Sequence, residues 1–305
     1  MTEQIIEITK DACHLAVDRG FMTVSQDGQE IGRVPLDTIA AVIANAHGLT
    51  YTNNLIVQLA SQNSMMVFCG SNHSPAAYIW SVDGFHQQSG RMEAQVAASQ
   101  PTIKRLWQQL VKSKIAHQAA VIEALGQPVV PIRALIAEVK SGDPDNIEAQ
   151  AARRYWPMVF GSDFRRDQGA GGVNALLNYG YMIIRSTVAR YIMAAGLHPS
   201  FGLHHSNDFN AMRLVDDVME PFRPYVDFTV YNLKKMGLEE VTPDTKRILA
   251  GLPETEMVGR RGSTAMRQCI QNLCISLSQV FTGEAQELDL PEPQPLLWRH
   301  QAGQQ

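Results

Sequence analysis

The chain has 305 residues, 45% of them hydrophobic and 18% charged, and this composition excludes a disordered or collagen-like protein. The net charge of −4 excludes a uniformly basic nucleic-acid-binding surface but permits a local basic face. Residues 1–90 contain 3 basic and 8 acidic side chains, whereas residues 91–190 contain 13 basic and 8 acidic ones. We therefore expect a polyanionic partner to bind outside the first 90 residues.

The sequence favours a cytoplasmic protein. None of the four cysteines belongs to a C-x-x-C pair, so we expect free thiols and no structural zinc site. The first ten residues include acidic side chains and no long apolar run, so we expect no signal peptide. Residues 38–82 contain no Asp, Glu, Lys or Arg, but polar side chains interrupt them, and we interpret this stretch as buried core or a subunit contact rather than a membrane span.

The first 85 residues are expected to be rich in strands. Residues 22–25 and 30–34 flank Asp27 and Gly28, a dipeptide typical of a β-hairpin. The other expected elements of this part are strands at 39–44, 65–69 and 76–82, and a helix that follows a cap at Thr52 or Asn53.

After about residue 90 the apolar spacing becomes helical. Helices are predicted at residues 106–125, 174–195, 214–219, 227–236 and 264–281, and the proline-rich tail from 284 is expected to be extended. The sequence therefore predicts an α+β protein with a small N-terminal β-rich domain, residues 1–90, followed by a larger all-α catalytic domain, residues 91–305.

Two segments of the helical part carry polar groups that packing does not require. Glu148 lies in the first turn of a helix that Asp145 or Asn146 can cap. The simplest interpretation of this residue alone is a first-turn carboxylate that the helix dipole stabilises. Residues 196–207 contain three histidines in a loop rich in Gly and Pro, and imidazole suits a transition metal or a general base. Each histidine alone is more often a packing or surface residue.

A third segment, residues 208–224, combines carboxylates at helical spacing. Asp217 and Glu220 are three residues apart and share a helical face, whereas Asp216 points away from it. A divalent cation would relieve their repulsion, although a solvated acidic helix end is the simpler alternative. Glu, His and Glu from separate segments together indicate an open metal site. Nearby basic pairs, which suit phosphate, favour phosphodiester chemistry over sugar or peptide chemistry; they are Arg153-Arg154, Arg165-Arg166, Lys234-Lys235 and Arg260-Arg261.

Several motifs resemble the CRISPR adaptation integrase family, the first of the two core CRISPR-associated adaptation proteins. They are NALLNYGY at 174–181, GLHP at 196–199, His205, DDVMEPFRP at 216–224, PLDTIA at 35–40 and VFCG at 67–70 followed by HSP at 73–75. The resemblance covers roughly residues 10–280, and the double histidine and compact length are most similar to the subgroup of type II systems. A charged Arg213 departs from the mostly apolar pattern of the family.

The resemblance implies an N-terminal β-domain that dimerises and a C-terminal helical domain that carries the active site. It implies that Glu148, His205 and Glu220 bind Mg²⁺ or Mn²⁺, with Asp217 as a supporting carboxylate. His205 is preferred to His204 because it precedes Asn210 by the family's spacing. The expected partners are captured duplex DNA, the repeat array, a second copy of the chain, the small second adaptation protein, and in some systems the effector nuclease and other adaptation proteins.

The expected reaction is a metal-dependent transesterification in which a 3′-hydroxyl of captured DNA attacks a phosphodiester of the repeat array; with water, the same site is an endonuclease. The basic residues expected to bind DNA are Arg153, Arg154, Arg165, Arg166, Arg260 and Arg261. Two alternatives stay open: a helical metallohydrolase of nucleotides, and a non-catalytic assembly subunit that functions through residues 38–82.

Overall fold

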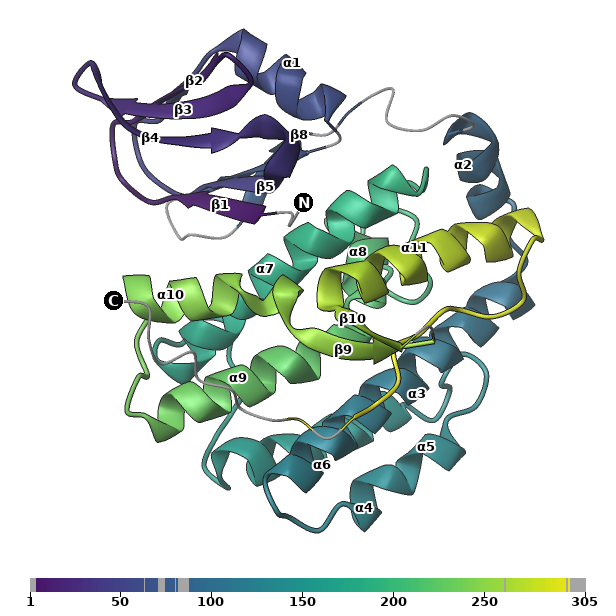
Figure 1. The fold of residues 1–305 in the computed structure, drawn as a ribbon. Helices are drawn as coiled ribbons and strands as arrows, with labels where there is room; N and C mark the ends of the chain where they lie inside the picture. Colours follow the sequence, from purple (N-terminus) through teal and green to yellow (C-terminus); the bar gives the residue numbers. More distant parts are fainter. Residues whose placement is uncertain are drawn as a thin grey trace.

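The computed structural model describes residues 4–62, 64–70, 75–79, 81, 88–260, 262–294 and 296. Its β-rich N-terminal part lies over a larger helical part (Figure 1). No helix among these residues is long and apolar enough to cross a bilayer.

The N-terminal part consists of two sheets and one α-helix. Its described elements are β1 (Gln4–Ile8), β2 (His14–Asp18), β3 (Phe21–Gln26), β4 (Gln29–Pro35), the 3-10 helix η1 (Leu36–Thr38), β5 (Ile39–Ala44), β6 (Thr50–Tyr51), α1 (Asn53–Ser61), β7 (Met65–Cys69) and β8 (Pro75–Ile79). One sheet has the order β1-β5-β7-β8, parallel except for the pairing of β7 with β8, and the other has the order β4-β3-β2-β6. The β3–β4 hairpin at Asp27 and Gly28 and the Thr52 cap of α1 confirm the sequence predictions.

The inner strands β5 and β7 are buried on both faces. Val42 and Met66 pack into the small core between the two sheets, whereas their neighbours Ile43, Met65 and Val67 pack into the core of the helical part. Side chains on a strand alternate between its faces, so a strand covered on both sides contains few polar residues. This explains the lack of charge in β5 and β7, which form buried core; the described loops and α1 of residues 38–82 are partly exposed.

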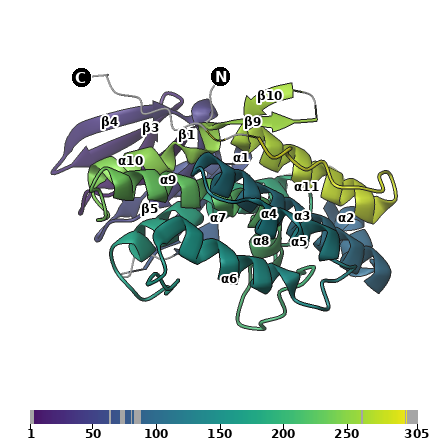
Figure 2. The ribbon, with the colours of Figure 1, turned by 90° about the horizontal axis from the view of Figure 1, so that it is seen from below.

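The helical part contains long helices around a central one. Its described elements are α2 (Gln88–Val96), α3 (Gln100–Ala124), α4 (Val130–Arg133), α5 (Leu135–Glu138), α6 (Ile147–Phe160), α7 (Val173–Ala194), α8 (Arg213–Val218), the 3-10 helix η2 (Glu220–Phe222), α9 (Arg223–Lys235), α10 (Pro243–Ala250), the 3-10 helix η3 (Leu252–Glu254), β9 (Glu256–Gly259), β10 (Gly262–Ala265) and α11 (Met266–Thr282). Most side chains of α7 are buried, as expected for a helix that is apolar on all sides and lies between the sheet and other helices (Figure 1). α3 packs against α6, α9 and η2, which carry part of the candidate site. Figure 2 shows α3 and α6 within the helical part.

The prediction of a wholly helical second domain is wrong in one detail. β9 and β10 form an antiparallel hairpin, and Thr264 lies in β10, so α11 begins two residues later than the start predicted for this helix. These strands are four residues each and lack alternating apolar residues, so the sequence carried little signal for them.

The tail after α11, predicted from the sequence to be extended, packs against the helical part as far as Glu292. Leu288 is buried, its amide donates to Gln109 and its carbonyl accepts from Arg260, while the amide of Glu292 donates to Val258. The tail therefore belongs to the fold.

A polar cluster joins the two parts. Glu7 of β1 accepts a hydrogen bond from the Tyr179 hydroxyl of α7, and Asn45 donates to the same carboxylate at 2.6 Å. Lys246 of α10 lies 3.5 Å from Glu7 and over the ring of Tyr179. The sheet is thereby held on α7 by apolar packing and by charge.

Candidate functional site

One buried carboxylate fixes the histidine-rich loop between α7 and α8. Asp217 is fully buried and accepts hydrogen bonds from the amides of Leu203, His204 and His205 at 2.6, 3.1 and 3.2 Å. A Cβ at Gly202 would lie 2.9 Å from Asp217 Oδ2 and 2.8 Å from the His205 carbonyl oxygen, closer than real Cβ contacts come. The loop therefore needs glycine at position 202.

The same carboxylate orients His205. Nδ1 of His205 lies 2.6 Å from Asp217 Oδ1, and because a carboxylate accepts, Nδ1 donates and Nε2 is left for a ligand. This hydrogen bond raises the pKa of His205 against the effect of burial, and the negative charges of Asp217, Glu220 and Asp216 raise the pKa further. The His205 side chain is 40% exposed, so it can meet a ligand from solvent.

The neighbouring histidine has a different position. The ring of His204 stacks on Trp107 of α3, with centroids 4.4 Å apart and planes 1° from parallel. His205 meets the same tryptophan only edge-on, at 6.2 Å. The two histidines are therefore not equivalent, and His205 is the one bonded to Asp217.

Glu148 and Glu220 face one another across Lys114 of α3. The ammonium nitrogen of Lys114 lies 2.6 Å from Glu148 Oε1 and 2.5 Å from Glu220 Oε2. Glu148 is placed at the start of α6, where the Asp143 carboxylate accepts from its amide and Asn146 caps the helix. Two carboxylates separated by 72 positions in sequence thus meet at one cation.

Glu220 is the more buried of the two, with a side chain 5% exposed. Burial acts to raise its pKa, but the positive charges of Arg223, 2.9 Å away, and Lys114 outweigh burial and lower the pKa. Burial likewise acts to lower the pKa of Lys114, but Glu220 and Glu148 outweigh it and raise the pKa. Both groups are therefore charged at neutral pH.

These residues have the chemistry of a divalent-cation site, although within the described ranges no three His, Cys, Asp or Glu side chains are grouped closely enough to hold a metal as they stand. Two carboxylates and one imidazole form a donor set suited to Mg²⁺ or Mn²⁺. Oε2 of Glu220 is buried and faces the ammonium group of Lys114, 2.5 Å away. A buried carboxylate oxygen that faces a cationic side chain fits a metal ligand.

Asp216 does not belong to this cluster. It forms a two-pronged ion pair with Arg185 of α7, at 2.6 and 3.1 Å, and accepts from the Asn210 side chain at 2.7 Å. Its role is to fix the end of the histidine loop on α7, in agreement with the predicted direction of its side chain.

Another buried carboxylate, Asp227, lies behind the cluster. Asp227 accepts from the hydroxyl of Tyr155 at 3.0 Å and from that of Tyr181. Burial raises the pKa of Asp227 to about 6, against these hydrogen bonds and the charges of Arg223 and Lys114. Arg223 lies over the ring of Tyr181, which links this group to Glu220.

Sequence reasoning missed Lys114, Arg223 and Asp227. One signal for Lys114 was available, since it follows Trp107 and Leu110 at helical spacing on the buried stripe of α3, where an apolar residue is expected. Arg223 lay within the DDVMEPFRP motif but received no role.

The arginines predicted to bind DNA differ in solvent exposure and in the hydrogen bonds that they already make. Arg153, Arg154 and Arg165 are exposed, although Arg154 donates to the Pro131 carbonyl and Arg165 to the carbonyls of its own loop. Arg166 is half-buried and donates to Asn174 and Asn178, so it has a structural role. Arg260 is exposed and donates to the tail at Leu288, and Arg261 lies outside the described residues.

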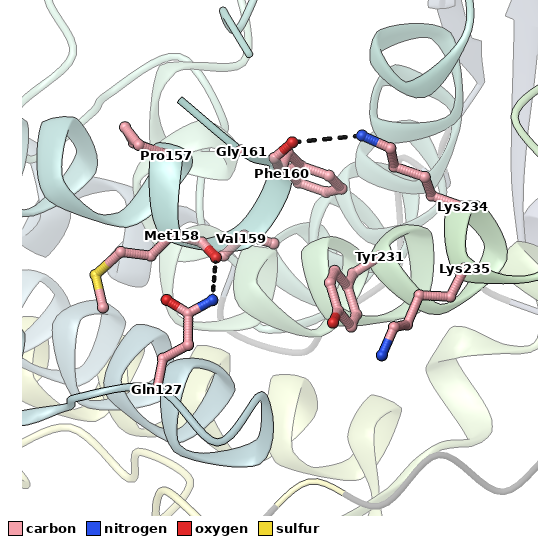
Figure 3. A pocket seen from close by; sticks show the side chains of 9 residues that line it. All are labelled: Gln127, Pro157, Met158, Val159, Phe160, Gly161, Tyr231, Lys234 and Lys235. Carbon is pink, nitrogen blue, oxygen red and sulfur yellow. Dashed lines mark hydrogen bonds between the residues drawn. The ribbon is translucent and has the colours of Figure 1, made fainter. Parts of the chain in front are cut away.

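A separate pocket of about 430 Å³ opens at the far ends of α6 and α9 (Figure 3). Lys234 donates to the Phe160 carbonyl beside it, and Lys235 lies near the ring of Tyr231. Glu148 lies in the first turn of α6 and Phe160 ends the helix, roughly 18 Å away at 1.5 Å per residue. The pocket is therefore not part of the carboxylate cluster.

A β-rich N-terminal part joined to a helical part is the architecture that the resemblance implied. A sequence model of the family described as CRISPR associated protein Cas1 matches residues 6–243. The CRISPR-associated endonuclease Cas1 of Neisseria meningitidis serogroup C (strain 8013) is 33% identical over 92% of this chain and 94% of its own length. The chain therefore belongs to the Cas1 family.

Two solved structures have the same fold. A casposase bound to an integration product has a TM-score of 0.79 and 19% identity, over 94% of this chain and 92% of its own. A Cas6-RT-Cas1–Cas2 complex has a TM-score of 0.74 and 16% identity, over 96% of this chain and 36% of that one. The predicted α+β fold class is confirmed, whereas the assignment to the type II subgroup stays a prediction.

Proposed function

We propose that this protein is the integrase and endonuclease of CRISPR adaptation, which inserts short captured DNA into the repeat array. Membership in the Cas1 family supports this, as do an endonuclease among its relatives and a casposase, bound to an integration product, among the proteins of similar fold. The observation that carries the proposal is the meeting of Glu148 and Glu220 at one ammonium group, with His205 close enough to affect the pKa of Glu220.

The proposed cofactor is Mg²⁺ or Mn²⁺, held by Glu148, His205 and Glu220. When bound, the cation would neutralise charge on the phosphate and favour deprotonation of the attacking 3′-hydroxyl. Asp217 keeps the proton of His205 on Nδ1 and so presents Nε2 to the ligand. Arg223 holds the other oxygen of Glu220, which limits the carboxylate to one direction.

The proposed partners are DNA, a second copy of the chain and the small second adaptation protein. A complex of Cas1 with Cas2 is among the structures of similar fold, which supports the last of these. DNA is expected to be held chiefly through its phosphates by the exposed arginines of the helical part, and binding should therefore weaken steeply with salt.

The test is an integration assay with a supercoiled plasmid that carries the repeat, short duplex DNA, the small partner and Mn²⁺. His205→Ala should abolish strand transfer and leave DNA binding largely intact. His204→Ala is the matched control, because His204 is the adjacent histidine but stacks on Trp107. Strand transfer by His205→Ala at the wild-type rate would show that the site assignment is wrong.

The same preparation distinguishes the two alternatives. Turnover of mononucleotides without DNA binding would favour a nucleotide hydrolase. If Glu220→Ala still supports adaptation fully without added metal, the protein would be a non-catalytic assembly subunit instead.

A further inference from the structure

Lys114 lies on a face of α3 that is otherwise built for packing. Leu110 and Trp107, one and two turns earlier on the same stripe, are fully buried, and the Lys114 side chain is only 13% exposed. A charged group is costly at such a position unless its partners are equally fixed. Its partners here are Glu148 and Glu220, which are the two carboxylates of the candidate metal site.

We propose that Lys114 is a built-in competitor of the divalent cation: its ammonium group holds Glu148 and Glu220 together in the metal-free protein and withdraws when the cation binds. The inference rests on the metal site of the proposed function and adds to it a residue that sets how tightly the metal is held. Lys114 is thus a positioning residue for the two acidic ligands rather than a ligand itself.

One ammonium group is shared between the two carboxylates. It donates a hydrogen bond to Glu148 Oε1 and lies 2.5 Å from Glu220 Oε2. A metal ion has no donor angles to satisfy and can bind both oxygens at once. The cation therefore has an advantage over the ammonium group at the same place.

The charge balance shows why both cations cannot remain. In the metal-free protein the charges of Lys114 and Arg223 balance those of Glu148 and Glu220. A divalent ion added to this buried group would leave an excess of two positive charges, and repulsion between close cations is strong where water is excluded. Arg223 lies on the other oxygen of Glu220, so the flexible side chain of Lys114 is the one that leaves.

The experiment measures Mn²⁺ binding by the metal-free protein by calorimetry, without DNA. Lys114→Met keeps the length of the side chain and removes its charge, and it should lower the Kd for Mn²⁺ roughly ten-fold or more because no ammonium group has to be displaced. Lys114→Arg keeps the charge and should not tighten binding. Lys112→Met on the same helix is the matched control and should bind Mn²⁺ as the wild type does.

An unchanged or higher Kd in Lys114→Met, with normal binding by the wild type, would overturn the role of Lys114 and leave the metal site standing. Absence of Mn²⁺ binding by both the wild type and Lys114→Met would overturn both the metal site and the role of Lys114. If Lys114→Met does not fold, a crystal structure of the wild type with Mn²⁺ decides: the ammonium group should have left Glu148 and Glu220, and Mn²⁺ bound with Lys114 still between them would contradict the proposal.

Discussion

Nδ1 of His205 and Oδ1 of Asp217 lie 2.6 Å apart, and the same aspartate binds the backbone of the loop that carries the histidine. One buried carboxylate therefore sets both the path of the loop and the direction of its imidazole. A substitution of Asp217 should therefore displace the loop and release the His205 ring from its orientation at the same time.

Asp217→Asn should destabilise the protein by about 2 kcal/mol or more, because a buried charged acceptor of several hydrogen bonds is lost. Strand transfer should be lost as well, since His205 is no longer held in one tautomer. Urea unfolding and the integration assay measure the two effects. Asp208→Asn, an exposed carboxylate of the same loop, is the control: it should retain stability and strand transfer, and equal loss of strand transfer in both variants would contradict this role of Asp217.

Gly202→Ala tests the close approach of the loop to α8. The added Cβ would meet Asp217 Oδ2 at 2.9 Å and the His205 carbonyl at 2.8 Å, so the loop must shift. We expect a loss of roughly 1 to 3 kcal/mol in the free energy of unfolding, together with lost strand transfer. Gly171→Ala, where a Cβ meets open space, is the control; wild-type activity in Gly202→Ala would show that the loop adapts without moving His205.

Asp227 should give the free energy of unfolding a distinct dependence on pH. Its pKa is about 6 in the folded protein, above the ordinary value of 3.8, so the folded state binds its proton more tightly. The stability that this group contributes is present below pH 4 and is lost as pH rises through 6. The wild type should therefore lose roughly 2 to 3 kcal/mol relative to Asp227→Asn between pH 4 and pH 7.

Urea unfolding at a series of pH values measures this difference. The exposed Asp244→Asn is the control and should keep a constant difference from the wild type. If the free energies of unfolding of the wild type and Asp227→Asn change with pH in parallel, the pKa of Asp227 is not raised in the folded protein and the prediction is wrong.

The two arginines of the 165–166 pair should behave differently. Arg165→Glu should weaken DNA binding and reduce the slope of log K against log salt by about one, as for one lost phosphate contact. Arg166→Glu should mainly destabilise the fold, because Arg166 donates to Asn174 and Asn178. Binding titrations at several salt concentrations, together with thermal unfolding, separate the effects; an unchanged salt slope in Arg165→Glu would exclude that residue from the DNA-binding surface.

Local patterns predicted much of the fold, because they depend on neighbours in sequence. Asp27 and Gly28 allow the hairpin turn, and Thr52 caps α1 through its own side chain. The β9–β10 hairpin escaped prediction because its stability comes from packing on α11 and the tail rather than from its own apolar pattern.

The candidate site was predictable only as a set of residue types. Glu148, His205 and Glu220 were chosen by motif and chemistry, but the partner that joins two of them, Lys114, comes from a third helix. Spacing in sequence relates residues within one helix and carries no information on which helices meet. Asp216 and Asp217 are adjacent and identical in type, yet Asp216 binds Arg185 of α7 and Asp217 binds the histidine loop. The sequence does not distinguish these two roles.

The meeting of Glu148 on α6 with Glu220 beyond α8 also has a consequence for synthesis on the ribosome. A growing chain exposes its first acidic group long before the second has been translated, and the imidazole emerges between them. Nascent or truncated chains that stop before η2 therefore lack half of the carboxylate pair, so the pair can form only after residue 220 has been translated.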